Sequence, residues 1–258
     1  MAAAHRFVAS ALVLAVSATT AIGAQGRRGG APAAPRRPGT VERFSVAGKE
    51  VAVYLPGSHA TEPSRRFPVL YLLGGYPIEN LKLPEAADRL ANAQGFSEPI
   101  VVVPDALASA SAEKFVADDL VSYVDAHYRT IAARISRGLA GYSAAGLVAL
   151  RIGMKRPELF SSLYVMSACC LTNDVLMSLD DAAANLQRYY ALAVDTGARE
   201  AQQLASNRQL HDAMARLRIP HYYEEYDGEP TGRIDTRLLP FFSRNLAAPA
   251  NPTSPAVQ

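Results

Sequence analysis

Short runs of mostly apolar residues recur through the middle of the chain. They occupy residues 68–73, 99–104, 138–140, 162–167 and 189–194. Runs of this kind are typical of strands that are buried on both faces of a parallel sheet. Residues 41–55 predict two further strands around a turn at 47–49, and residues 221–226 predict one more.

Helical patterns separate these runs. Helices are predicted at residues 83–94, 114–128, 147–154, 200–217 and 234–246. Residues 170–188 predict a short, partly helical segment. Strands that alternate with helices indicate an α/β fold with a mostly parallel central sheet and helices on both faces. Because ligands of such sheets bind at the carboxyl ends of the strands, the functional site is expected there.

One turn of the chain carries a chemical motif. Residues 141–146 read Gly-Tyr-Ser-Ala-Ala-Gly, between the apolar run 138–140 and the helix-forming run 147–154. This is the strand–turn–helix context of a nucleophile elbow, in which Ser143 would stand on a strained turn. Small residues suit such a turn because helix and strand approach closely around the serine. The pattern predicts that Ser143 is a nucleophile, and an ordinary strand–helix turn is the alternative.

The sequence around this turn resembles a known family. Arg137-Gly-Leu-Ala-Gly-Tyr-Ser-Ala-Ala-Gly, followed by Lys155-Arg-Pro-Glu-Leu-Phe, is similar to the putative-esterase (esterase D-like) family of α/β-hydrolases. Residues 70–76, Leu-Tyr-Leu-Leu-Gly-Gly-Tyr, resemble the oxyanion strand of that family. The resemblance covers about residues 51–246 and implies an α/β-hydrolase fold with a small lid or none. The family includes carboxylesterases, feruloyl esterases and mycolyltransferases, so no particular activity is implied.

The resemblance assigns the nucleophile and the oxyanion hole to named positions. Ser143 is the nucleophile, and the backbone N–H of Ala144, the next residue, donates to the oxyanion. The second donor is expected from the loop after residues 70–73, at Gly75 or Tyr76. Relatives usually carry His-Gly in this loop, whereas this chain has Gly-Gly.

The resemblance also suggests a catalytic acid. Relatives carry it in a Gly-x-x-Asp turn after a strand, and residues 197–200 match this turn with Glu200 in the acid position. Alternatively, Glu200 only stabilises the start of a helix, where negative charge is favourable. Asp195 is then the fallback acid.

The position of the catalytic base departs from the family. Relatives place a histidine after the last strand, in Tyr-x-Gly-x-His-x-x-Arg, but residues 226–233 read Tyr-Asp-Gly-Glu-Pro-Thr-Gly-Arg. Pro230 therefore stands in the histidine position, and proline can neither accept nor donate a proton. His5 lies in the predicted signal peptide. The remaining histidines are expected away from the carboxyl ends of the strands; they are His59, His127, His211 and His221. The resemblance thus implies a degenerate catalytic triad.

The ends of the chain predict targeting and disorder rather than structure. Residues 1–24 predict a cleaved signal peptide, with a membrane anchor as the alternative. Residues 25–40 are almost entirely Gly, Pro, Ala and Arg and predict a disordered leader. Residues 41–246 are expected to form one α/β-hydrolase domain, followed by a disordered tail at 247–258. The mature protein is expected to be secreted or periplasmic, without a membrane span.

The charge argues against a nucleic-acid partner. The chain has 26 Lys and Arg against 24 Asp and Glu, but residues 1–40 hold five of the arginines and no acidic residue. The remaining body has 21 basic against 24 acidic residues, so it is mildly acidic. Nucleic-acid binding would require basic residues clustered on a folded face.

The sequence predicts neither a cofactor nor a metal. It contains no zinc-binding His motif, no Cys-x-x-Cys pair and no Gly-rich nucleotide loop. Its two cysteines, Cys169 and Cys170, are adjacent; two buried thiols are expected, and a strained vicinal disulfide is the alternative.

Two functions remain open. The first is slow hydrolysis of a small-molecule or carbohydrate-linked carboxylic ester by Ser143, since an oxyanion hole and substrate binding can leave residual catalysis without a full triad. The second is a catalytically inactive, esterase-like binding protein.

Overall fold

The computed structural model describes residues 37–74, 77–105, 111–199, 201–228 and 230–247. The predicted signal peptide, most of the predicted leader and the tail from residue 248 lie outside these ranges, so those predictions stay open. Within the described ranges, no helix is long and apolar enough to cross a membrane.

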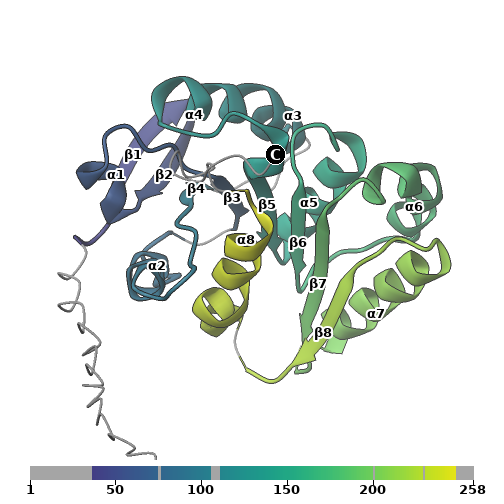
Figure 1. Ribbon diagram of the computed structural model, residues 1–258. Helices are drawn as coiled ribbons and strands as arrows, with labels where there is room; N and C mark the ends of the chain where they lie inside the picture. Colours follow the sequence, from purple (N-terminus) through teal and green to yellow (C-terminus); the bar gives the residue numbers. More distant parts are fainter. Residues whose placement is uncertain (1–36, 75–76, 106–110, 200, 229, 248–258) are drawn as a thin grey trace, which may run out of the picture. The chain divides into compact units, whose positions relative to one another are not determined.

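The described part of the chain is built on an eight-stranded sheet with the strand order β1-β2-β4-β3-β5-β6-β7-β8 (Figure 1). Strand β2 is antiparallel to β1 and β4, and the other neighbouring pairs are parallel. The strands are β1 Thr40–Val46, β2 Lys49–Leu55, β3 Val69–Leu73, β4 Ile100–Pro104, β5 Arg137–Tyr142, β6 Ser162–Met166, β7 Ala191–Gly197 and β8 Tyr222–Tyr226. The prediction of a mostly parallel α/β sheet is confirmed.

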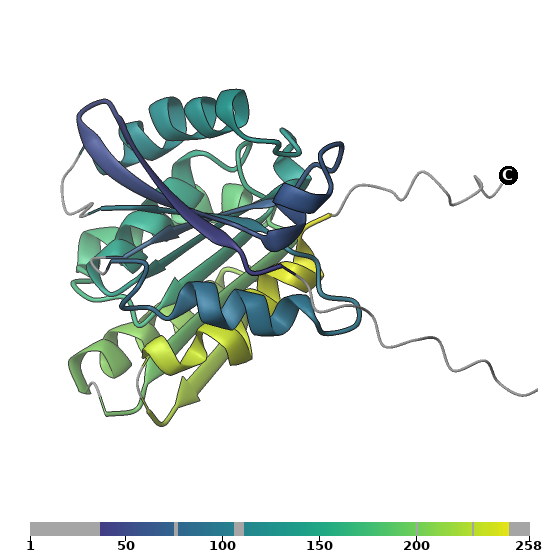
Figure 2. The same ribbon diagram turned by 90° about the vertical axis from the view of Figure 1, so that its left-hand side faces the viewer.

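Helices pack on both faces of this sheet, as Figures 1 and 2 show from two sides. One face is covered by α2 Leu83–Ala91, η4 Ile234–Leu238 and α8 Leu239–Asn245. The other is covered by α3 Ala112–Lys114, η1 Phe115–Leu120, α4 Val121–His127, α5 Ala144–Lys155, α6 Asn173–Leu186 and α7 Ala201–Arg216. Three short helices lie in connections: α1 Gly57–Thr61, η2 Arg134–Ser136 and η3 Pro230–Arg233.

The alternation of side chains along each strand divides the core into two clusters. In β3, Val69 and Tyr71 belong to the cluster under α4 and α5, whereas Leu70 and Leu72 belong to the cluster under α2 and α8. Each strand is therefore apolar on both sides, which explains why the sequence shows unbroken apolar runs rather than an alternating pattern.

The segment predicted as short and partly helical at 170–188 contains a full helix, α6. It buries Val175, Leu179 and Leu186 in the same core cluster as α5. Helix α6 is thus a structural crossover between β6 and β7, in keeping with a small lid or none.

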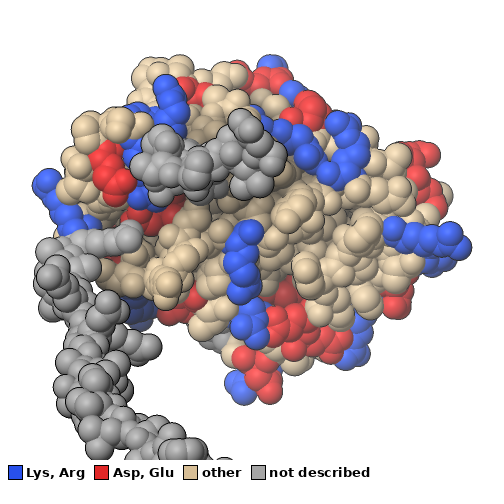
Figure 3. Space-filling view, in the orientation of Figure 1, with Lys and Arg blue, Asp and Glu red and all other residues tan. Residues whose placement is uncertain are grey.

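Both signs of charge are mixed on the face shown in Figure 3, where Lys and Arg lie beside Asp and Glu. Many of the described charges are paired, for example Arg156 with Asp118 and Arg208 with Glu225, each at 2.7 Å. Exposed pairs of this kind contribute little to stability one by one.

Candidate active site

Ser143 connects β5 directly to α5 in a strained backbone conformation, with φ 56° and ψ −123°. A positive φ in a residue that carries a β-carbon costs about 1–3 kcal/mol and persists only where neighbouring structure enforces it. Here β6 and the segment after it do so. The Ser143 N–H donates to the Met166 carbonyl at 3.0 Å, and the Cys169 N–H donates to the Ser143 carbonyl at 3.2 Å. The turn has the strand–turn–helix geometry of a nucleophile elbow.

Two glycines permit the close approach of β5 and α5. A β-carbon on Gly141 would lie 2.2 Å from the carbonyl oxygen of Ala145. A β-carbon on Gly146 would lie 3.0 Å from the carbonyl oxygen of Gly141. Both neighbours are backbone atoms, which cannot rotate away. A β-carbon on Gly141 would therefore force the backbone to shift, whereas one on Gly146 would make a tight contact.

We therefore expect Gly141→Ala to lower the free energy of unfolding by about 2–3 kcal/mol, because overpacking against fixed atoms carries a cost of that size. Gly74→Ala is the matched control, since a β-carbon there would meet no atom of the described residues within 4 Å. Its effect should stay within about 0.5 kcal/mol. Urea denaturation of both variants measures the difference, and equal effects would contradict the steric argument.

The register of the sheet places Asp195 in line with the elbow. Tyr142 on β5 pairs with Met166 on β6, and Met166 pairs with Asp195 on β7. Ser143 directly follows Tyr142, and neighbouring strands lie about 4.8 Å apart, so roughly 10 Å separate the backbones of Ser143 and Asp195. At that distance the Asp195 carboxylate cannot take the hydroxyl proton of Ser143 directly, and a side chain between them would have to do so.

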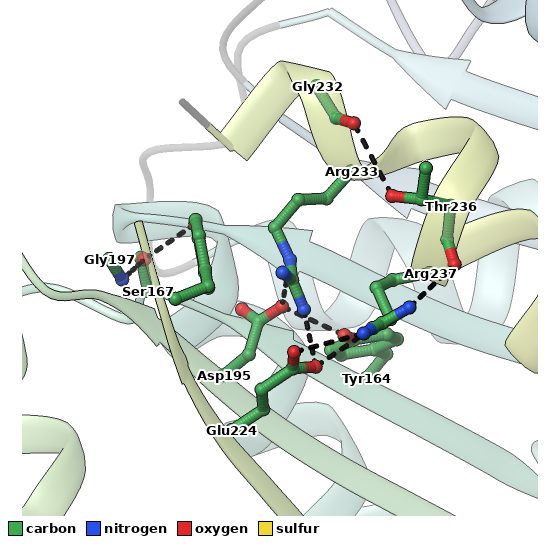
Figure 4. A network of polar contacts seen from close by, with 10 residues as sticks. Tyr164, Ser167, Asp195, Gly197, Glu224, Gly232, Arg233, Thr236 and Arg237 are labelled. Carbon is green, nitrogen blue, oxygen red and sulfur yellow. Dashed lines mark hydrogen bonds and ion pairs between the residues drawn. The ribbon is translucent and has the colours of Figure 1, made fainter. Parts of the chain in front are cut away.

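Asp195 is 1% exposed and lies in a polar network (Figure 4). The Tyr164 hydroxyl donates to its Oδ2 at 2.8 Å, and Arg233 Nε lies 3.3 Å from the same oxygen. Among the described residues, its Oδ1 has no hydrogen-bond partner. Burial raises the pKa of Asp195 to about 6, although the hydrogen bond from Tyr164 and the charge of Arg233 act in the opposite direction. Asp195 therefore titrates close to neutral pH.

Arg233 joins the segment after β8 to two strands of the sheet. Besides its ion pair with Asp195 on β7, its Nη2 donates to Glu224 on β8 at 2.6 Å. The guanidinium also lies 3.9 Å from the centre of the Tyr226 ring. Arg237 Nε donates to the same Glu224 carboxylate at 3.0 Å. Because Arg233 is the last residue of η3, this network anchors η3 to both β7 and β8 (Figure 4).

The four described histidines lie away from the carboxyl ends of β5 to β8. His59 belongs to α1, which precedes β3, and His127 ends α4, where its ring stacks on Tyr123 at 3.9 Å. His221 precedes β8, and its Nε2 lies 2.8 Å from Nδ1 of His211 on α7. Both rings of this pair are therefore engaged near the amino end of β8.

The sequence matches a known protein family. Residues 48–233 match the model of the family described as Putative esterase. The chain belongs to this family. A comparison with proteins of curated function gives no match.

Several solved structures share the fold. A ferulic acid esterase has 23% sequence identity and a TM-score of 0.72, covering 81% of this chain and 98% of its own. A ferulic acid esterase from Anaeromyces mucronatus, in complex with ferulic acid, has 18% identity and a TM-score of 0.66, covering 83% of this chain and 93% of its own. A fluorophosphonate-binding serine hydrolase from Staphylococcus aureus has 16% identity and a TM-score of 0.65, covering 81% and 98% respectively. At these identities the likeness establishes the α/β-hydrolase fold.

The structure places only some of the predicted catalytic positions. Ala144 is the exposed first residue of α5, and a helix leaves its first N–H groups without intrahelical acceptors. Within the described ranges this N–H has no acceptor, so it is available to an oxyanion. Pro230 begins η3, shortly after β8 ends. The predicted acid Glu200 and the predicted donors Gly75 and Tyr76 lie outside the described residues.

Sequence reasoning missed the network around Asp195. It named Asp195 only as a fallback acid and Arg233 only as part of a family pattern. The available signal was a carboxylate inside the apolar run of β7, because a buried charge needs a partner. Among the residues that the structure describes, no group of three or more His, Cys, Asp or Glu could hold a metal ion.

Proposed function

We propose that this chain is a secreted carboxylic-ester hydrolase in which Ser143 is the nucleophile and turnover is slow. The backbone of Ser143 is the observation that supports this most. A strained serine at the carboxyl end of a central strand, followed at once by a helix, presents its hydroxyl where ligands of such sheets bind. Secretion rests on the predicted signal peptide at residues 1–24.

In this proposal the Ser143 Oγ attacks the ester carbonyl carbon. The carbonyl oxygen gains negative charge, which the N–H of Ala144 and one N–H of Gly75 or Tyr76 stabilise. Collapse of this intermediate releases the alcohol and leaves an acyl group on Ser143, and water then releases the acid.

Slow turnover follows from the proton that Ser143 must lose. In a complete triad a histidine accepts it, and such assistance is worth about 10²–10⁴ in rate. Here the resemblance to the family puts Pro230 in the histidine position, and the described histidines lie at other places in the fold. The proton would pass to solvent instead.

The substrate class is an ester of a small molecule or of a carbohydrate. The structural relatives suggest a first compound, because two of them are ferulic acid esterases. A ferulate ester should therefore be tested beside a general esterase substrate.

The deciding experiment compares wild type with Ser143→Ala in the hydrolysis of p-nitrophenyl acetate and methyl ferulate. We expect slow hydrolysis by wild type and none above background by the variant. Ser178→Ala is the matched control, because Ser178 lies on α6 with its Oγ donating to the Val175 carbonyl at 2.7 Å. Equal rates for wild type and Ser143→Ala would refute the hydrolase proposal.

The second candidate is a binding protein that retains the hydrolase fold. One observation favours it: the charged partner of Asp195 is Arg233, an arginine, rather than an imidazole that Asp195 would orient toward Ser143. Such a protein would bind an ester or acid near the elbow without turning it over. Saturable binding of ferulic acid by both wild type and Ser143→Ala, without hydrolysis by either, would identify it.

A further inference from the structure

The two cysteines of the chain lie next to the Ser143 turn, because the Cys169 N–H donates to the Ser143 carbonyl. Cys169 and Cys170 follow β6 and are free thiols, and their sulfur atoms are 2.7 Å apart. Cys169 is half-buried and Cys170 is exposed. The prediction of two buried thiols is therefore wrong, since Cys169 is only half-buried and Cys170 is exposed.

The backbone that presents these thiols is strained. Ser167 and Cys170 have φ values of 40° and 63°, a region that residues with a β-carbon rarely adopt. Surrounding hydrogen bonds hold the segment in place. The Ser167 N–H donates to the Asp195 carbonyl at 2.8 Å, and Asn207 Nδ2 donates to the Ala168 carbonyl at 3.0 Å. Strain enforced in this way is typical of functional segments.

We propose that Cys169 and Cys170 form a reversible redox site that closes to a vicinal disulfide by exchange with a low-molecular-weight disulfide. The sulfur separation favours this over a metal site. Two thiolates bound tetrahedrally at about 2.3 Å from a zinc ion would lie roughly 3.7 Å apart, whereas a disulfide needs about 2.05 Å. The described residues also offer no cluster of metal ligands.

The exchange balances without any further reactant. The exposed Cys170, as a thiolate, attacks one sulfur of the small disulfide and releases the other half as a thiolate. Cys169, also deprotonated, then attacks the Cys170 sulfur and releases the second half. Two protein thiols are oxidised to one disulfide, one small disulfide is reduced to two thiols, and the two protons pass to the released thiolates or to solvent.

One property of the site makes the disulfide easy to reduce, and a second slows its formation at low pH. Adjacent α-carbons are 3.8 Å apart, below the 4.4–6.8 Å usual for a disulfide, so the closed form is strained and readily reduced. The hydrogen bond with Cys169, followed by burial, raises the pKa of the Cys170 thiol. Because the thiolate is the attacking species, closure should accelerate as the pH rises.

Formation of the disulfide should also change the hydrogen bonding of the turn at Ser143. The Cys169 N–H donates to the Ser143 carbonyl at 3.2 Å. The disulfide ring would contain the Cys169 α-carbon, which is bonded to that nitrogen, so closing the ring should shift this hydrogen bond. On the proposed function, the oxidised protein should hydrolyse p-nitrophenyl acetate at a different rate from the reduced protein.

The test treats the reduced full chain with oxidised glutathione and measures its mass. Wild type should lose two hydrogen atoms and carry no glutathione, and dithiothreitol should restore the original mass. Cys169→Ser and Cys170→Ser are matched controls, because each keeps one thiol and should retain one glutathione. A glutathione adduct on wild type like that of the variants, or no reaction, overturns the proposal.

Ester hydrolysis by the same samples separates this proposal from the proposed function. If the disulfide forms and the rate is unchanged, the redox site stands and its coupling to Ser143 is wrong. If the disulfide forms and neither redox state hydrolyses any ester above Ser143→Ala, the redox site stands and the hydrolase proposal fails.

Discussion

Replacing Pro230 with histidine should raise the rate of ester hydrolysis by about 10²-fold, at the lower end of what a general base contributes. Pro230 is the first residue of η3, after the carboxyl end of β8. The first position of a helix tolerates proline but does not need it, so the substitution should cost little stability. The expected gain comes from a proton acceptor for Ser143 at the position that we predict to match the family's histidine.

The network around Arg233 fixes the backbone near such a histidine. Arg233 ends the same helical turn, and its ion pairs with Asp195 on β7 and Glu224 on β8 tie the end of η3 to the two strands at this edge of the sheet. A side chain introduced at position 230 therefore starts from an anchored backbone.

Two further variants make this test decisive. Ser143→Ala in the Pro230→His background should abolish the gain, which shows that the new histidine acts through the serine. Thr231→His is the matched control, because it puts the same imidazole one residue later and should leave the rate unchanged. If Pro230→His folds normally and gains nothing over wild type, the alignment of position 230 with the family's histidine is wrong, and the binding-protein candidate becomes the better one.

The fold was accessible from the sequence because its determinants are local. A strand buried on both faces must be apolar throughout, and a close strand–helix turn must have glycine at the points of contact. Gly141 and Gly146 meet backbone atoms if a β-carbon is added, so the steric reason inferred from the motif is the one that the structure shows. The elbow could therefore be located from a few consecutive residues.

The polar network could not be located in this way, because its members come from distant parts of the chain. Tyr164, Asp195, Glu224 and Arg233 lie on β6, β7, β8 and η3, and only the strand order brings them together. The exposure of the two cysteines could not be predicted for a related reason. It depends on how the segment after β6 lies against the rest of the fold, and the left-handed backbone of Cys170 is not specified by the local sequence.

Replacing Arg233 with methionine should lower the free energy of unfolding by about 3 kcal/mol at pH 7. The Arg233 side chain is 12% exposed and its partner Asp195 is 1% exposed, so the substitution leaves a buried carboxylate without its cation. Removing one partner of a buried ion pair typically costs about 3–5 kcal/mol. Methionine retains most of the apolar volume of the arginine stem, so the loss is chiefly electrostatic.

Arg237→Met is the matched control. Arg237 is 51% exposed and pairs with Glu224, which keeps its bond to Arg233 in this variant. Because exposed ion pairs contribute about 0–1 kcal/mol, this substitution should cost less than about 1 kcal/mol.

The pH dependence gives this prediction a signature that a packing defect would lack. The pKa of Asp195 is raised from its ordinary value of 3.8 to about 6 in the folded protein, so its protonated form favours folding and this contribution is lost as the pH rises from about 4 to 6. Without Arg233 the pKa of Asp195 should rise further, and the loss should continue to higher pH. Glu224 contributes a pH dependence of the same sign. Arg237 and Arg233 lower the pKa of Glu224, and the loss of Arg233 destabilises the protein only at pH values where the Glu224 carboxylate is ionised.

Urea denaturation of Arg233→Met and wild type should therefore show a stability difference that is largest at pH 7–8 and shrinks toward pH 4. A difference that is the same at every pH would show that Arg233 contributes by packing alone and that its charge does not stabilise Asp195.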